Sequence, residues 1–251
     1  MCCTARTGHA YAVADVAAEL TEAVHVWTLA PHALDMATRA RYEVSLSDDE
    51  MARWQRYLRA RDRDLFVAAR GFLRQVLSQY VEVPAAAWRF DISEFGKPSI
   101  VNPEGRRLQF NLSHTAGTEP NGGLVAVAVT ADVACGIDAE SVDSVDNPLL
   151  IAATAMSAYE RADLANQPDP RRRFFEYWTL KEAYLKARGA GLRLPLDRFG
   201  FVFDPDPRLC VEPPIEDDPL SWQFAMHQSD GSLIMAIAVQ TGSRPRAITF
   251  V

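Results

Sequence analysis

Long hydrophobic runs are missing from this sequence: nowhere do about 18 consecutive residues stay apolar, the length that a membrane-spanning helix needs. The N-terminal segment MCCTARTGHAYAVADVAAEL also lacks a basic stretch followed by an apolar one, so it does not predict a signal peptide. We therefore expect a cytoplasmic protein that does not enter a membrane.

Cysteine and positive charge are scarce as well. The four cysteines, Cys2, Cys3, Cys135 and Cys210, show neither metal-site spacing nor the density of a disulfide framework, so we expect unpaired thiols. There are 26 lysines and arginines against 33 acidic residues, which gives a net charge of −7. This balance argues against a nucleic-acid-binding protein, and any anionic ligand must be met by a local basic cluster.

The order of predicted elements favours an α+β protein. The 251 residues are enough for one large domain or for two of about 120 residues each. Apolar–polar alternation and apolar runs predict strands at 24–29, 88–92, 108–114, 124–130, 133–140, 199–203, 222–227, 233–240 and 246–250. Helical patterns cover 51–80, as one broken or two consecutive helices, and 146–165, whereas the segment 204–219 predicts a loop. Because this pattern begins again after Ala131, we predict an N-terminal half at 1–131 and a C-terminal half at 132–251.

The stretch FFEYWTLKEAYLKARGAG, residues 174–191, predicts a further helix that ends at its glycines. At about 100° per residue, Phe174, Trp178 and Leu185 fall within about 40° of arc, with Glu182 and Lys186 on one flank. The predicted helix therefore has an apolar face that can pack against the core, with charged side chains along one edge of that face. Taken alone, Glu182 and Lys186 could also be an ordinary surface pair.

Two acids, Asp138 and Glu140, lie two residues apart in the predicted strand of GIDAE. A period of two puts both carboxylates on one face of the strand, where their repulsion calls for a cation or a proton. Mg²⁺ suits them because it prefers hard oxygen ligands and is usually completed by substrate phosphates. Two solvated acids at a strand end are the alternative.

Other polar residues stand where they could meet a ligand. Ser113 and His114 end a predicted strand, and Lys97 lies in a tight turn between Gly96 and Pro98. One long helical stretch holds seven arginines, Arg53, Arg56, Arg59, Arg61, Arg63, Arg70 and Arg74. Most of them are expected to face solvent, while one or two could hold a phosphate.

These motifs together resemble the Sfp-type 4′-phosphopantetheinyl transferases. They are GKP at 96–98, FNLSH at 110–114, GIDAE at 136–140 and WTLKEAYLK at 178–186, and the resemblance extends over roughly residues 45–200. It implies a fold of two similar α+β halves related by a pseudo-twofold, with the active site at their junction. It also implies transfer of the phosphopantetheine arm of coenzyme A, the co-substrate, to a serine of an apo acyl or peptidyl carrier protein, which releases adenosine 3′,5′-bisphosphate.

The same resemblance assigns roles to individual residues. Asp138, Glu140 and Glu182 would bind Mg²⁺ together with the pyrophosphate of coenzyme A. Glu182 would be the general base, with Glu160 assisting through water. The resemblance implies that Lys181 is structural and pairs with an acid near the metal.

The resemblance also assigns the phosphate contacts. Lys186, His114 and Lys97 match positions that contact the phosphates, and Ser113 lies beside them. Arg53 stands where the family often has a lysine for the 3′-phosphate, and an arginine can bind a phosphate as well.

Two other classes of protein remain as alternatives: a Mg²⁺-dependent pyrophosphohydrolase and a non-catalytic module that binds coenzyme A. The first would need a nucleophilic water, and the glutamate-rich helix expected of it is missing from the sequence. The second would be expected to lose Glu182 or Asp138, which are both present. The resemblance further implies a monomer, and we expect the basic triplet at 171–173 to contribute to carrier docking.

Overall fold

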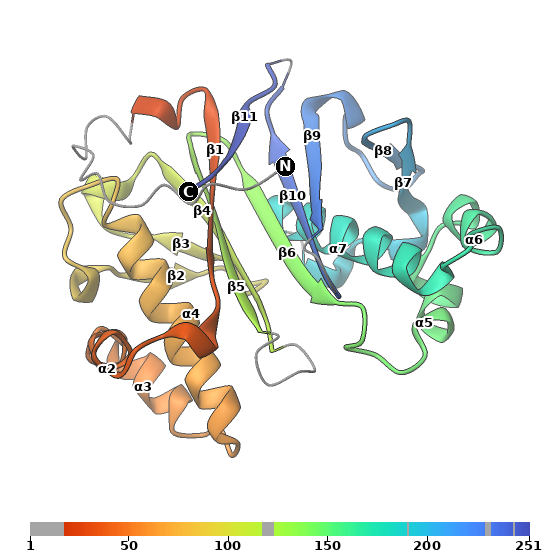
Figure 1. Cartoon of the computed structure of the whole chain (residues 1–251). Helices are drawn as coiled ribbons and strands as arrows, with labels where there is room; N and C mark the ends of the chain where they lie inside the picture. The colour runs from red at the N-terminus through yellow and green to blue at the C-terminus, as the bar shows by residue number, and fades with distance from the viewer. Residues whose placement is uncertain (1–17, 117–122, 190, 229–231, 243) are drawn as a thin grey trace.

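The computed structural model describes residues 18–116, 123–189, 191–228, 232–242 and 244–251. Its described strands form two main sheets and two hairpins (Figure 1). The first sheet has the order β11 (Ala247–Phe250), β1 (Ala23–Leu29), β5 (Leu124–Ala131) and β4 (Leu108–Thr115), and only the β11–β1 pair is parallel. The second is antiparallel, with the order β6 (Cys135–Ser141), β10 (Leu233–Gln240) and β9 (Trp222–Gln228). The hairpins join β2 (Phe90–Ile92) to β3 (Pro98–Ile100) and β7 (Phe199–Phe203) to β8 (Pro207–Val211).

Two long helices cover the sheets, and shorter ones complete each half. The helices are α2 (Met36–Val44), α3 (Asp48–Trp54), α4 (Ala60–Leu77), α5 (Pro148–Ala155), α6 (Ala158–Leu164) and α7 (Pro170–Arg188). Short 3₁₀ turns are η1 (Pro31–Ala33), η2 (Ala85–Ala87), η3 (Pro103–Gly105), η4 (Gly191–Arg193), η5 (Leu196–Arg198) and η6 (Pro219–Ser221). Among the described residues, no helix combines the length and the apolar composition needed to cross a membrane.

The elements stack as helix, sheet, sheet and helix, with α4 and α7 on opposite outer sides (Figure 1). Alternation along the central strands explains this order, because successive side chains point to opposite faces. On β5, Val127 and Val129 pack toward α4, whereas Ala126 and Ala128 pack against the second sheet. On β10 the neighbours of Ile237 pack against α7, while Ile237 itself faces the first sheet. The α+β prediction with two similar halves is confirmed.

Most predicted elements are present, and the exceptions have local causes. All nine predicted strands are found, and the stretch at 51–80 holds two consecutive helices. The stretch at 146–165 is helical as predicted but holds two helices, α5 and α6, instead of one. A capping box at Ser157 starts the second: the Ser157 hydroxyl accepts from Glu160 N, and the Glu160 carboxylate accepts from Ser157 N. The loop predicted at 204–219 contains β8, and α2 and β3 were not predicted.

The boundary between the halves stays a prediction. Ala131 ends β5, and β6 begins four residues later at Cys135. However, β11 at the C-terminus pairs with β1 and so belongs to the first sheet. The predictions for Cys2, Cys3 and the N-terminal segment, and most of the wide loop at 115–123, lie outside the described residues.

Candidate active site

The helix α7 is fixed at both ends by its own sequence. Asp169 accepts a hydrogen bond from Arg172 N, Pro170 occupies the first turn, and Gly189 ends the helix with a φ of 66°. This left-handed conformation suits glycine, whose missing Cβ removes the steric cost. Most of the helix is buried, but Glu182 and Lys186 are only partly buried and face the junction between the halves.

A glycine in β6 lets α7 lie directly on this strand. A Cβ built on Gly136 would overlap the backbone of Ala183 and Ala187 in α7. The neighbouring Ile137 and Ala139 face the first sheet, so the alternation turns Asp138 toward the helix side. The sequence prediction that Asp138 and Glu140 share one face, opposite Ile137, therefore agrees with the structure.

Asp138, Ser113 and Lys186 meet where β4, β6 and α7 converge. Lys186 Nζ lies 2.6 Å from Asp138 Oδ1 and donates to Ser113 Oγ at 3.1 Å. Ser113 Oγ donates to Asp138 Oδ1 at 3.0 Å and accepts from Ala139 N at 3.2 Å. The Asp138 side chain is 5% exposed, and its Oδ2 is buried without a hydrogen-bond partner. A buried carboxylate oxygen without a partner is costly, so this atom is available to a cation.

Two further acids share this region. Burial first, and then the charges of Asp138 and Glu182, raise the pKa of Glu140 to about 7. Burial followed by the charge of Asp138 also raises the pKa of Glu182, while Lys186 opposes both shifts. The chemistry of three acids fits a divalent cation. Even so, among the described residues no group of three or more His, Cys, Asp or Glu side chains is arranged to hold a metal ion.

A cleft next to these acids joins the two halves. Its volume is about 270 Å³, and it is lined by Phe95, Gly96, Lys97, Pro98, Asn111, Leu112, Glu182, Leu185, Lys186, Gly189 and Gly191. Lys97 Nζ donates to Ala187 O at 2.6 Å, which ties the β2–β3 turn to the last turns of α7. Burial lowers the pKa of Lys97. The cleft thus brings together Lys97, Glu182 and Lys186, as expected from the sequence.

A second basic group lies on the α4 side of β4. His114 is exposed and points to the opposite face from Ser113. The protein around the imidazole still removes part of its hydration, and this desolvation is the main reason that the pKa of His114 is lowered. The positive charges of Arg70, Lys186 and Arg53 lower it further. Arg53 and Arg70 both lie over the Phe66 ring, at 5.7 and 5.6 Å from its centroid. We call Arg53, Arg70 and His114 the phosphate cluster, because three cationic or proton-binding groups this close favour an anion between them.

Arg70 is the member of the phosphate cluster that sequence reasoning did not single out. It was one of seven arginines in a helical stretch, and their periodicity does not separate it from the others. The only available signal was its position four residues after Phe66, which places both on one face of α4.

Glu160 lies outside the cleft. It is fully buried, and its carboxylate pairs with Lys181 Nζ at 2.9 Å and accepts from Phe201 N at 3.0 Å. Lys181 also donates to Leu196 O at 2.8 Å. The structure therefore does not bring Glu160 to Glu182, and the acid paired with Lys181 is Glu160 rather than one of the cleft acids.

The basic triplet at 171–173 is engaged within the protein. The Arg171 guanidinium donates to Val142 O at 2.7 Å and Val145 O at 2.5 Å, which holds the chain between β6 and α5. Arg172 donates to a glutamine of β9, and Arg173 pairs with acids of α6 and α7. These contacts leave the triplet poorly suited to the docking role that we expected for it.

Comparison with known proteins gives matches over most of the chain. A family model described as the 4′-phosphopantetheinyl transferase superfamily matches residues 134–238. A second, described as the N-terminal part of 4′-phosphopantetheinyl transferase, matches residues 27–128. The 4′-phosphopantetheinyl transferase HetI of Nostoc sp. is 32% identical over 225 residues, which cover 88% of this chain and 89% of the relative. The 4′-phosphopantetheinyl transferase Sfp of Bacillus subtilis is 26% identical over 220 residues, 87% of this chain and 92% of the relative.

A solved structure, the holo-[acyl-carrier-protein] synthase of Thermotoga maritima, also matches. Its TM-score is 0.37 at 22% identity, and the match covers 43% of this chain and 62% of that one.

Proposed function

Because the chain belongs to the 4′-phosphopantetheinyl transferase superfamily, we propose that it transfers the phosphopantetheine arm of coenzyme A to a serine of an acyl or peptidyl carrier protein. The products are the holo-carrier protein and adenosine 3′,5′-bisphosphate. The enzyme class, phosphopantetheinyl transferase, is common to the named relatives, and this chain spans most of their length.

The observation that carries this proposal is the contact of Lys186 with Asp138 at the edge of the cleft. A lysine held by a carboxylate keeps its ammonium in place, so it can face the negative charge of a pyrophosphate without reorganising. Lys97 reaches the same cleft from the opposite half. The pyrophosphate of coenzyme A would therefore lie between cations that come from both halves.

Asp138, Glu140 and Glu182 are the residues that would hold Mg²⁺, and the unpartnered Asp138 Oδ2 supports this assignment. When bound, the metal would neutralise charge on the pyrophosphate oxygens. Binding must draw the acids closer than they are in the described structure.

Glu182 is the proposed general base. Its pKa is raised by burial, which makes it a better proton acceptor than a solvated glutamate. As the carrier serine attacks the β-phosphorus, its hydroxyl proton passes to Glu182 and a new O–P bond forms. The bond from this phosphorus to the bridging oxygen breaks, and the electron pair leaves with adenosine 3′,5′-bisphosphate.

The phosphate cluster is the proposed site of the 3′-phosphate. Arg53 and Arg70 supply positive charge, although Glu50 lies 3.8 Å from Arg70 Nε. The charges of Arg70, Lys186 and Arg53 all lower the pKa of His114, so these cations act on the same region. Ser113 orients Lys186 rather than facing solvent, since it is buried and bonded to both Asp138 and Lys186. Action as a cytoplasmic monomer, without nucleic acid or membrane, stays a prediction.

Intact mass spectrometry tests the proposed function. A panel of apo acyl and peptidyl carrier domains is incubated with the protein, coenzyme A and Mg²⁺, with a parallel reaction in EDTA. The expected result is a gain of one phosphopantetheine on some carriers, formation of adenosine 3′,5′-bisphosphate, and loss of both in EDTA. Cleavage of coenzyme A without any gain on a carrier would instead indicate a pyrophosphohydrolase.

A further inference from the structure

The turn between α3 and α4 carries an unusual concentration of positive charge. Residues 53–63 hold five arginines and one aspartate in a chain whose net charge is −7. At the tip of this turn, Leu58 is 95% exposed, and Arg56 and Arg59 beside it are exposed as well. We call Arg56, Leu58 and Arg59 the arginine face.

The two arginines of this face are not engaged within the protein. In the part of the chain that the structure describes, neither Arg56 nor Arg59 has an ion pair or a side-chain hydrogen bond. The triplet at 171–173, by contrast, uses its guanidinium groups to bind loop carbonyls, an amide and acids. Exposed arginines without partners, placed next to a fully exposed leucine, form a surface that fits an acidic partner with an apolar side chain.

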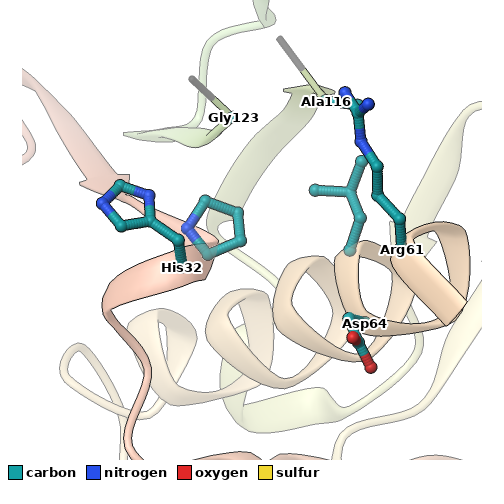
Figure 2. Close-up of a pocket in the computed structure, with 7 residues that line it drawn as sticks. His32, Arg61, Asp64, Ala116 and Gly123 are labelled. Carbon is teal, nitrogen blue, oxygen red and sulfur yellow. The ribbon is translucent and has the colours of Figure 1, made fainter. Parts of the chain in front are cut away.

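The arginine face adjoins the phosphate cluster. Arg56 shares a shallow depression with Arg53 of the phosphate cluster. On the other side of the turn, Arg61 and Ala116 line one hollow of about 480 Å³, and Figure 2 shows the Arg61 guanidinium beside Ala116. Ala116 lies two residues after His114, so the start of α4 adjoins the end of β4.

We infer that the arginine face is the docking surface for the protein acceptor, and that it binds an acidic helical face of a carrier protein through Arg56 and Arg59 while Leu58 packs against an apolar residue. This inference rests on the proposed function. A partner held here lies next to the phosphate cluster, so its serine can reach the cleft while the 3′-phosphate end of coenzyme A remains bound. The opposite charges also favour rapid encounter, because steering acts mainly on the association rate.

Steady-state kinetics with an apo acyl carrier domain test the inference. The double variant Arg56→Glu/Arg59→Glu, its two single variants and Leu58→Ser are compared with Arg208→Glu, which reverses one charge at an exposed arginine on β8 and is the charge-matched control for each single arginine variant. The expected result is an increase in carrier KM of about tenfold or more for the double variant and a smaller increase for Leu58→Ser. The KM for coenzyme A and the kcat at saturating carrier should stay at wild-type values, and Arg208→Glu should change nothing.

A charge-reversed carrier completes the test. Replacing acids of its docking helix by lysine should weaken transfer by the wild type and restore it with the double variant. An unchanged carrier KM in the double variant would overturn the inference, as would an increase confined to the KM for coenzyme A. Transfer by the wild-type protein is measured first, so failure of the proposed function shows as no transfer at all, whereas failure of this inference shows as transfer that ignores these substitutions.

Discussion

Lys186 Nζ and Asp138 Oδ1 are 2.6 Å apart, and this contact joins the last turns of α7 to the middle of β6. The same ammonium reaches Ser113 of β4 in the first sheet. One lysine therefore connects both halves at the point where the acids gather. Its position depends on how closely α7 lies on β6.

Removing the charge of Asp138 should abolish most transfer without unfolding the protein. Asp138→Asn keeps the size of the side chain but leaves Lys186 without its carboxylate and removes a proposed metal ligand. We expect a loss in kcat of at least about 100-fold, measured by carrier mass gain, with a near-native thermal transition. Asp143→Asn, an exposed acid in the following loop, is the control. Wild-type activity of Asp138→Asn would contradict its role in the cleft.

Adding one methyl group at Gly136 should displace α7. The new Cβ would overlap the backbone of Ala183 and Ala187, so the helix must move away from β6 and carry Lys186 with it. Overpacking of this kind lowers the free energy of unfolding by about 1–3 kcal/mol. The kcat should fall even under conditions where nearly all of the variant is folded, because Lys186 is displaced in the folded state. Denaturant unfolding and single-turnover kinetics measure the two effects. Gly242→Ala is the control: its new Cβ meets open space, but its φ of 61° is strained for alanine. This variant should therefore lose stability through backbone strain and keep its kcat.

Arg70 should bind the 3′-phosphate of coenzyme A. Arg70→Gln removes one charge from the phosphate cluster, and a charge-assisted hydrogen bond is worth about 1.5–3 kcal/mol. We therefore expect the KM for coenzyme A to rise by about tenfold or more, while the KM for 3′-dephospho-coenzyme A stays the same in wild type and variant. An equal rise for both substrates would show that Arg70 acts on the fold instead.

The ion pair of Glu160 and Lys181 should matter for stability rather than for catalysis. Both side chains are almost fully buried, so Glu160→Gln leaves the Lys181 charge without its partner. Breaking a buried pair in this way costs about 3–5 kcal/mol. Equilibrium unfolding should show this loss, while folded enzyme retains its kcat. A large fall in kcat with unchanged stability would instead support the water-assisted base that the sequence suggested.

The sequence predicted the chemistry of the site better than its geometry. Asp138 and Glu140 on one face of β6, and Glu182 with Lys186 on α7, follow from periodicities of two and about 3.6 residues. Periodicity does not say how strands from distant segments pack, so the contact of Ser113 with Asp138 was not predicted. The pairing of Glu160 with Lys181 was not predicted for the same reason: the capping-box position of Glu160 fixes the start of α6 but not the direction in which its carboxylate is buried.

A buried histidine far from the cleft should make stability depend on pH. His25 is 2% exposed in β1, and its Nδ1 lies 3.0 Å from Tyr80 Oη. Trp27 Nε1 donates to the same hydroxyl at 2.7 Å, so the hydroxyl proton is free to bond a neutral Nδ1. Burial lowers the pKa of His25 from its ordinary value of 6.5, and Glu19 at 3.6 Å only partly opposes this shift.

Since the folded-state pKa lies below the unfolded one, the unfolded chain binds more protons between the two values. The contribution of His25 is therefore fully present above pH 6.5 and is lost as the pH falls through its folded-state pKa. Urea unfolding at a series of pH values should show this decrease, and His25→Gln should make the slope shallower. The exposed His32→Gln is the control and should leave the slope unchanged. The same slope in wild type and His25→Gln would mean that another group governs the acid limit of stability.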